Sequence, residues 1–567
     1  MGFVAAFSLF NDVGTAASTI VGICGAITAV GALARAAGAS RRRARARALK
    51  ISWQVGSRAE QTGALALNES KTTFENVVLT VACGIHGREV RQDLGLLRAG
   101  QDYLWASTVV HESLRSRKVD HGLDQGNGAS HDRRPHGVQV TFRNGRRYWF
   151  RDDKRVERVK SLVIWAEQTR AKTLARYFGQ WSPFHRSYPV SVKVQPFERT
   201  EALEHAFMRL AETGDPPRGH EVPDVVVGPH DWIGRVARDE SVVEPPLNPK
   251  WVRPISPSAL EALSRNDRLY AIPYVFDSVA LIRNNALTGP GPMPTSLAEA
   301  VAAGEKALEA KGIEDGSALA LQVGAPDAHG NAGDPFHMWP LFASLGGSFF
   351  GFRGQESGAG SFDDISRWRE SFVDAFVRLA ELGCAPDGKG VLRPTLGRAE
   401  ALELFLSGRA PFFVCSSRGL AAIRDRKLDV TVGVVPPAGD QPAQPMVSVY
   451  GMYIYRDAPN LPAARDLLTS YVSQPRAGLD LNRFQQLVPV QDEAMSKIGE
   501  RDPVLRPYVE QCRRGLHMPS WPEMREAWQL VGRAQYEVLA GDGGDPRELA
   551  AVTAERGWEL LRQARGA

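Results

Sequence analysis

Acidic and aromatic side chains follow an apolar strand in the stretch from Val222 to Gly234, which contains Asp231 and Trp232. In an open α/β sheet, ligands bind beyond the carboxyl ends of the strands. A carboxylate at such a position accepts hydrogen bonds from two donors, and a flat ring covers an apolar face. The turn is therefore a candidate recognition site. A cap for the helix that starts near Trp232 is the structural alternative for Asp231.

Motifs for catalysis are absent from the sequence. It has no Gly-x-Ser-x-Gly elbow, no Gly-x-x-x-x-Gly-Lys-Ser/Thr phosphate loop and no His-Glu-x-x-His zinc motif. Asp231 and Asp277 could be imagined as the acid and base of a glycosidase, but neither lies in an evidently apolar context that would raise its pKa. We therefore expect a protein that is not an enzyme.

Residue types that bind metals do not form a ligand set. His121, His131 and His136 lack the spacing of a metal site and fall in a polar, Gly-rich segment. The five cysteines are odd in number and show no paired spacing, so neither a disulfide framework nor a zinc site is predicted. We expect no metal and no cofactor.

Alternating strands and amphipathic helices begin near residue 158 and must position the candidate residues. Strands are predicted at 161–165, 190–194 and 225–227, with helices at 170–181 and 201–213 between them. This alternation indicates βαβ units and a largely parallel sheet. Further helices are predicted at 296–311, 368–382 and 399–407, and further strands at 411–414, 430–435 and 446–455. About 410 residues of α/β pattern suit two lobes with a cleft between them.

A β-rich region precedes the α/β region. Short apolar strands are predicted at 51–55, 74–83 and 103–110, and Asn144-Gly145 separates two further strands. Asn-Gly between strands is a strong signal for a type I′ hairpin. We expect a small β-sandwich-like domain over residues 51–157, followed by a two-lobed domain over residues 158–567.

The first 50 residues predict a membrane anchor. After a tail at 1–12, residues 13–34 carry no charge and are enough to cross a bilayer, so we predict one transmembrane helix at 13–37. A basic juxtamembrane segment follows at 38–50, with its densest part at Arg41–Arg47. The positive-inside rule places this basic segment, and the domains after it, on the cytoplasmic side.

The charged residues on either side of the apolar run also favour a membrane anchor. Asp12 precedes the apolar run and the arginines follow it, which is not the pattern of an ordinary export signal. The bulky Ile23 before Cys24 argues against a lipoprotein cleavage site. Nucleic-acid binding by Arg41–Arg47 is possible in principle. A collar beside the anionic inner leaflet explains these arginines more simply, so we expect no nucleic-acid partner.

Six groups of residues occur in order between residues 158 and 565. They are Leu162-Val-Ile-Trp165; Pro223-Asp-Val-Val-Val with His230-Asp231; Leu269 to Asp277 leading to Leu281-Ile-Arg-Asn284; Asp334 to Pro340; Gly433-Val-Val-Pro436; and Met518 to Pro522 with Trp528. No single group is specific, but together they resemble the maltose- and maltodextrin-type solute-binding proteins of ABC importers. The resemblance implies an α/β, two-lobed periplasmic-binding-protein-like fold with hinge strands, which closes over a sugar.

The resemblance also implies a set of ligand-binding residues. They are Arg170, Glu204, Asp231, Trp232, Asp277, Asp334, Phe336, His337 and Trp528. The residue types fit, because sugar hydroxyls need acceptors and donors and a pyranose ring needs flat aromatic faces. Structural alternatives stay open: Asp277 as a surface charge in a turn, Glu204 on a solvated helix face, and Trp528 in core packing. Trp339 is assigned to the core.

Two positions depart from the family pattern. Gly228 stands where the maltose binder has a large aromatic residue, and Cys415 to Arg418 stand where family members often carry Gly-Pro-Trp. Loss of two ligand-facing rings would remove about 1 to 3 kcal/mol each. Maltose itself is therefore not implied as the ligand.

Two functions follow from these expectations. The first is the substrate-binding component of an ABC sugar importer, which binds an oligosaccharide outside the cell, closes its lobes and docks on permease subunits. The second is a membrane-anchored sugar sensor that faces the cytoplasm, where a partner or the β-rich domain detects the same closure. The family resemblance favours the first, and the Arg41–Arg47 cluster favours the second.

Overall fold

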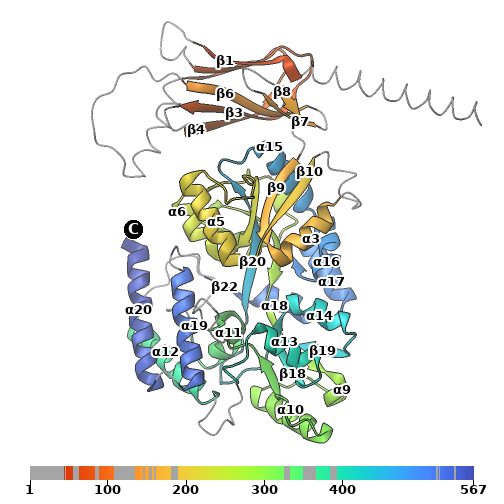
Figure 1. Ribbon diagram of the computed structural model, residues 1–567, viewed down its shortest axis with the longest axis vertical. Coiled ribbons are helices and arrows are strands. Elements are labelled where there is room, and N and C mark those ends of the chain that lie inside the picture. The colour runs from red at the N-terminus through yellow and green to blue at the C-terminus, as the bar shows by residue number, and fades with distance from the viewer. Residues whose placement is uncertain are drawn as a thin grey trace, which may run out of the picture. The chain divides into compact units, whose positions relative to one another are not determined.

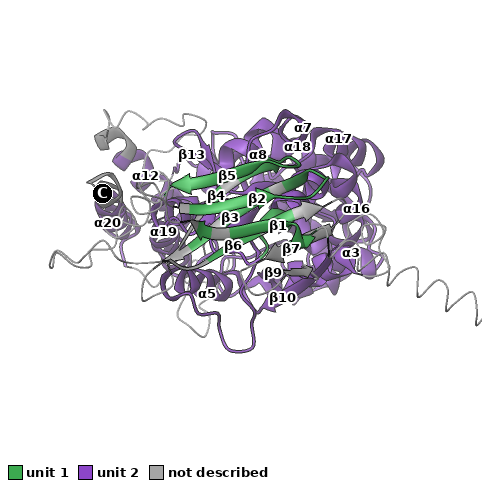
Figure 2. Cartoon of the chain, turned by 90° about the horizontal axis from the view of Figure 1, so that it is seen from above, with its two compact units in different colours: residues 1–160, 460–463 green, residues 161–459, 464–567 purple. Residues whose placement is uncertain are grey.

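The computed structural model describes most of the α/β region and the strands of the N-terminal region. The described residues are 44, 46–54, 63–83, 88–106, 135–144, 147–151, 156–158, 161–179, 190–324, 332–348, 365–383, 392–518, 522, 524–541 and 544–566. The chain divides into two compact units (Figure 2). One comprises residues 1–160 with 460–463, and the other residues 161–459 with 464–567.

None of the helices within the described ranges is long and apolar enough to cross a membrane. The transmembrane helix that we predicted at 13–37 lies outside these ranges, together with the tail at 1–12 and the basic residues 38–43. The polar segment with His121 and His131 also lies outside them.

The N-terminal unit contains two antiparallel sheets, with the strand orders β1-β2-β5 and β4-β3-β6-β7-β8. The strands are β1 (Leu49–Gln54), β2 (Gly63–Asn68), β3 (Phe74–Cys83), β4 (Arg88–Leu97), β5 (Asp102–Ala106), β6 (Pro135–Asn144), β7 (Arg147–Arg151) and β8 (Val156–Arg158). Both sheets contribute to one buried core, which includes Ala66, Trp105 and Phe142. The predicted hairpin pairing is confirmed, because Asn144 of β6 lies opposite Arg147 of β7.

In the second unit, the two larger sheets each lie at the centre of a lobe (Figure 1). The first lobe comprises residues 161–277, 446–459 and 464–518. Its sheet has the order β10-β9-β11-β20-β15-β21. These strands are β9 (Ser161–Glu167), β10 (Ser191–Phe197), β11 (Val225–Pro229), β15 (Ile272–Asp277), β20 (Met446–Tyr455) and β21 (Val488–Pro489), with β12 (Val242–Val243) and β22 (Leu516–His517) beside β20.

The expectation of a largely parallel sheet needs correction at β20. The strands β9, β10 and β11 are parallel, but β20 pairs antiparallel with both β11 and β15 in the middle of the sheet. The physical reason is the route of the chain: it leaves the first lobe after β15 and enters β20 on its return from the second lobe, so β20 runs in the opposite direction. All ten residues of β20 are buried.

Helices cover the first-lobe sheet. They are α3 (Gln168–Phe178), α5 (Thr200–Thr213), α6 (Ile233–Arg238), α7 (Pro249–Val252), α8 (Pro257–Ala262), α16 (Pro475–Gln485), α17 (Asp492–Arg501) and α18 (Arg506–Arg514), with the short hairpin β13 (Ser264–Arg265) and β14 (Arg268–Leu269). Glu167 caps α3 by accepting hydrogen bonds from the backbone N–H groups of Thr169 and Arg170. Gly214 ends α5 with φ of 79°, a left-handed conformation that glycine adopts without strain.

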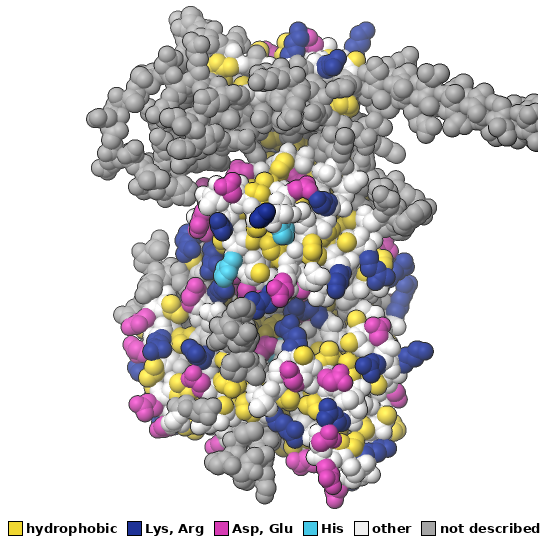
Figure 3. All heavy atoms as spheres, in the orientation of Figure 1, with side chains coloured by type: hydrophobic (Ala, Val, Ile, Leu, Met, Phe, Trp, Pro, Cys, Tyr) yellow, Lys and Arg dark blue, Asp and Glu magenta, His cyan; other side chains and the backbone are white. Residues whose placement is uncertain are grey.

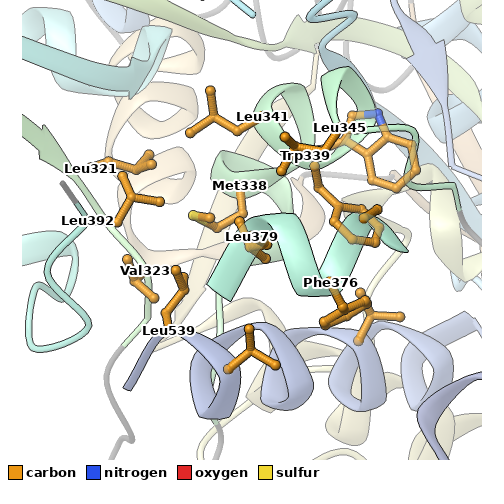
Figure 4. Close-up of a cluster of buried hydrophobic side chains, with 14 of the residues drawn as sticks. Leu321, Val323, Met338, Trp339, Leu341, Leu345, Phe376, Leu379, Leu392 and Leu539 are labelled. Atoms are coloured by element: carbon orange, nitrogen blue, oxygen red, sulfur yellow. The ribbon is translucent and has the colours of Figure 1, made fainter. Parts of the chain in front are cut away.

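The second lobe comprises residues 279–445 and 524–566, around a sheet of order β17-β18-β16-β19. Its elements are β16 (Val279–Asn284), α9 (Asn285–Thr288), α10 (Leu297–Lys311), β17 (Leu319–Leu321), α11 (Pro335–Ser344), α12 (Ile365–Ala380), α13 (Arg398–Leu406), β18 (Phe412–Ser416), α14 (Leu420–Asp425), β19 (Val430–Gly433), α19 (Met524–Ala540) and α20 (Pro546–Gly566). Its core joins side chains of α11, α12 and α19, among them Met338, Leu379 and Leu539 (Figure 4). Trp339 lies in this core and is 1% exposed, as expected.

Only Ser278 separates β15 of the first lobe from β16 of the second. Its hydroxyl donates to the carbonyl of Met446, the first residue of β20, over 3.4 Å. Gln511 of α18 donates to the carbonyl of Val279 over 2.5 Å. Two passages of the chain between the lobes, at Ser278 and at Met446, are therefore hydrogen-bonded to each other.

Candidate functional site

The candidate residues of the first lobe follow strands that end at one edge of its sheet. Since β20 is antiparallel to both β11 and β15, these two strands are parallel to each other and to β9 and β10. Glu167, Pro229 and Asp277 are the last residues of β9, β11 and β15. Tyr450 of β20 lies opposite Pro229 on one side and Val275 on the other. The carboxyl ends of the parallel strands, where α/β sheets bind ligands, are therefore shared by several candidate residues.

Asp231 lies in a single turn of 3-10 helix, His230–Trp232, directly after β11. No side-chain hydrogen bond caps α6, so the alternative role of Asp231 as a helix cap is not observed. Its Oδ1 atom is buried and has no hydrogen-bond partner. Burial, together with the nearby Glu204 carboxylate, raises the pKa of Asp231 to about 7. Our expectation that neither carboxyl group lies in a pKa-raising context is thus wrong for Asp231.

Glu204 lies on α5 but faces neighbouring arginines instead of solvent. Its Oε1 accepts from Arg235 Nη1 of α6 over 2.9 Å, and its Oε2 lies 3.4 Å from Arg525 Nη1 of α19. Arg235 Nη2 in turn lies 3.7 Å from Glu526 Oε1. Burial raises the pKa of Glu204, and the two arginines oppose that rise. These four residues form an ion-pair cluster that joins the first lobe to the second.

Arg170 lies in the first turn of α3 and is 2% exposed. Its Cζ atom lies 3.3 Å from the centroid of the Tyr450 ring, a cation–π contact. Nη1 lies 3.6 Å from Glu167 Oε2, too far for a hydrogen bond, and all three guanidinium nitrogens are buried without a hydrogen-bond partner. The Tyr274 hydroxyl, on β15, is buried without a partner as well.

Asp277 ends β15 and is fully buried, so the alternative of a surface charge is wrong. Its Oδ2 accepts from Arg418 Nε over 2.7 Å, and its Oδ1 accepts from the Ser417 hydroxyl over 3.3 Å. Arg418 and Ser417 form the short turn after β18 in the second lobe. The Arg418 side chain is 27% exposed. The departure from the family pattern at residues 415–418 therefore places a guanidinium group across the lobe junction, bound to Asp277.

Asp334 and His337 form a compact pair at the start of α11. Asp334 caps the helix by accepting from the His337 backbone N–H over 3.2 Å, and His337 Nδ1 lies 3.0 Å from Asp334 Oδ1. Gln322 also contacts both side chains. Burial alone would raise the pKa of Asp334, but His337 outweighs it and holds that pKa well below its ordinary range. The Asp334–His337 pair therefore caps the N-terminus of α11.

The aromatic candidate residues of the two lobes differ in how deeply they are buried. Trp232 is 3% exposed, and its ring lies 6.4 Å from that of Phe207 and 6.0 Å from that of Tyr453, centroid to centroid. The same ring fills the space beside Gly228, since a Cβ atom there would lie 2.2 Å from Trp232. Trp232 is therefore a core residue of the first lobe. Phe336 and Trp528 are only partly buried against the core of the second lobe, so core packing accounts for part of each ring.

Several residues that contact the candidate residues were not identified from the sequence. Arg418, Tyr450, Arg235 and Arg525 stand on elements far from their partners, and only the unusual residues at 415–418 gave a signal. Lys and Arg side chains gather across the middle of the two-lobed unit in the space-filling view (Figure 3). Among the described residues, no group of three or more His, Cys, Asp or Glu could hold a metal ion.

Comparisons with known proteins agree with the fold. A family model described as bacterial extracellular solute-binding protein matches residues 181–506. The maltotriose-binding protein of Pyrococcus abyssi (strain GE5 / Orsay) is 22% identical over 380 residues, which cover 65% of this chain and 76% of that protein.

Proposed function

The chain belongs to the family of bacterial extracellular solute-binding proteins, and we propose that its two-lobed domain, residues 158–567, binds an oligosaccharide of the maltodextrin class without chemical change. The observation that carries this proposal is Asp231, whose Oδ1 is a buried acceptor with no partner at the carboxyl edge of the sheet. A ligand hydroxyl would supply the missing donor. The similarity to a maltotriose-binding protein supports a glucosyl oligosaccharide as the ligand class.

The candidate residues take different roles in this proposal. Asp231 accepts from hydroxyl groups, and Arg170 donates to ligand oxygens. Phe336 and Trp528 of the second lobe supply ring faces. The remaining candidates act through their neighbours: Trp232 packs against Tyr453 in the core, Glu204 binds two arginines, Asp277 orients Arg418, and Asp334 orients His337.

Ligand binding would shift the balance between an open and a closed arrangement of the lobes. A ligand favours closure only if it contacts both lobes, since it must bind one arrangement better than the other. Asp231 and Arg170 belong to the first lobe, and Phe336 and Trp528 to the second. We expect closure to present the domain to the permease subunits of an ABC importer.

Calorimetry with maltotriose tests the site. The Asp231→Ala and Trp528→Ala variants should each weaken binding at least tenfold, about 1.4 kcal/mol. Asp215→Ala, an exposed carboxylate of the first lobe, is the matched control and should bind like the unchanged protein. If both site variants bind maltotriose as tightly as the control, this site is wrong.

The side of the membrane on which the domain acts needs a separate test. The family description favours the outside, whereas the Arg41–Arg47 cluster favours the cytoplasm and the sensor role. Alkaline phosphatase and a fluorescent protein that matures only in the cytoplasm can each be fused to the C-terminus. Phosphatase activity would support the importer component, and fluorescence without phosphatase activity would support the sensor.

A further inference from the structure

The guanidinium group of Arg170 is buried and makes no hydrogen bond of regular geometry to a described residue. A guanidinium group carries five N–H donors in a planar fork. All three nitrogens of Arg170 are buried without a partner, although the face of the group rests on the Tyr450 ring. An unsatisfied buried donor is costly, and more so when it is charged. A group with this geometry indicates a missing acceptor.

The neighbours of Arg170 add donors more than acceptors. The Tyr274 hydroxyl is buried beside Arg170 and makes no hydrogen bond of regular geometry; it can accept from Arg170 and still donate to a ligand. Each oxygen of Asp277 already accepts a hydrogen bond, from Arg418 and from Ser417. Both oxygens of Glu167 also accept hydrogen bonds, from backbone N–H groups of α3. The unmet capacity of this cluster is therefore dominated by donors.

The unused hydrogen-bond donors around Arg170 favour one class of saccharide over another. A neutral hydroxyl group offers one oxygen to these donors and carries no charge to balance the guanidinium group. A carboxylate brings acceptors only, and its two oxygens match the fork of a guanidinium group. The site also lacks two aromatic planes that a neutral glucosyl chain would stack on, because Trp232 fills the space at Gly228 and Arg418 stands in the other segment.

We propose that the saccharide bound by this domain carries an anionic group, in the form of a carboxylated sugar, and that Arg170 with Arg418 binds that group. The proposal rests on the proposed saccharide-binding function and narrows its ligand class. Arg418 comes from the second lobe and Arg170 from the first. An anion between them would bridge the lobes, so binding of the acidic group and closure would be coupled.

Calorimetry with three probes tests the proposal on the full chain. They are maltotriose, the same trisaccharide with its terminal glucose replaced by glucuronic acid, and maltotriose phosphate. We expect the glucuronic acid probe to bind at least about tenfold more tightly than maltotriose, with a preference that falls at high ionic strength. Equal or tighter binding of maltotriose would overturn the acidic ligand but leave saccharide binding intact. No binding of any probe would overturn both. Tightest binding of the phosphate probe would support an anion site and reject the carboxylated sugar.

Variants of α3 test whether the preference for the glucuronic acid probe depends on Arg170. Arg170→Gln should reduce the preference for the glucuronic acid probe to about twofold or less, while Arg170→Lys, which keeps the charge but loses the fork, should retain an intermediate value. Lys172→Gln removes a positive charge from the exposed face of the same helix and should leave the preference unchanged. Thermal melting of each variant separates loss of binding from loss of folding. A preference that survives in a folded Arg170→Gln variant would overturn the role of Arg170.

Discussion

Among the ion pairs that join the lobes in the described part of the chain, two sets differ in burial and in their place on the chain. The Asp277–Arg418 pair has a fully buried carboxylate and stands beside Ser278, where one strand passes directly from lobe to lobe. The cluster of Glu204, Arg235 and Arg525 joins α5 and α6 to α19, away from that passage, and its side chains are 9 to 24% exposed. Where the chain itself holds the lobes together, an ion pair contributes mainly to local stability. Where it does not, we expect the ion pairs to affect the distance between the lobes.

The largest effect should come from breaking the buried pair. Arg418→Ala leaves the Asp277 carboxylate buried without its cation, which should lower the free energy of unfolding by about 3 kcal/mol in urea denaturation. The double variant Arg418→Met with Asp277→Leu removes both charges and should recover most of that loss. A single variant as stable as the unchanged protein would show that Asp277 does not depend on Arg418.

The next effect depends on pH and concerns Asp231, which lies near Glu204. The pKa of Asp231 is about 7 in the folded chain and near 3.8 ordinarily, so the folded state keeps its proton where the unfolded state loses it. Its contribution to stability is full below pH 3.8 and is lost as pH rises to 7. Asp231→Asn should therefore raise the free energy of unfolding by about 2 kcal/mol at pH 8 and leave it unchanged at pH 3.5. The reverse pH dependence would contradict the burial of Asp231.

The smallest effect on stability should come from the cluster of Glu204, Arg235 and Arg525, whose arginines are partly exposed. Arg525→Gln should lower the free energy of unfolding by about 1 kcal/mol or less, because its ion pair is partly exposed. Without ligand it should also increase the radius of gyration measured by X-ray scattering, as the lobes separate. Arg533→Gln, on the same helix but paired with Glu537 at the surface, is the control and should change neither quantity. An unchanged radius in Arg525→Gln would show that this cluster does not set the distance between the lobes.

Local pattern predicted the elements well. The predicted strand at 446–455 coincides with β20, and helix 201–213 differs from α5 by one residue. The direction of β20 was not predictable from its own residues, because a fully buried strand has the same apolar composition in either direction. It depends on where the chain was before it entered the sheet.

Contacts between segments that are far apart in the sequence limited how much of the candidate site could be predicted. Asp277 could be found because it ends an apolar strand and Asp231 because it follows one closely, but their neighbours could not. Arg418 lies 141 residues from Asp277 along the chain, and Arg525 lies 321 residues from Glu204. An arginine on a helix looks the same in sequence whether it faces solvent or a buried carboxylate. Only the three-dimensional structure separates Arg170, whose buried guanidinium nitrogens have no hydrogen-bond partner, from a core residue such as Trp232.

The contact between Gly228 and Trp232 constrains how this edge of the sheet can change. Any side chain at residue 228 would collide with the Trp232 ring, and a smaller residue at 232 alone would leave a cavity beside Gly228. A relative with an aromatic residue at the first position must therefore carry something smaller at the second. The two positions are expected to covary, and a lineage that exchanged one arrangement for the other would have passed through an overpacked or a hollow intermediate.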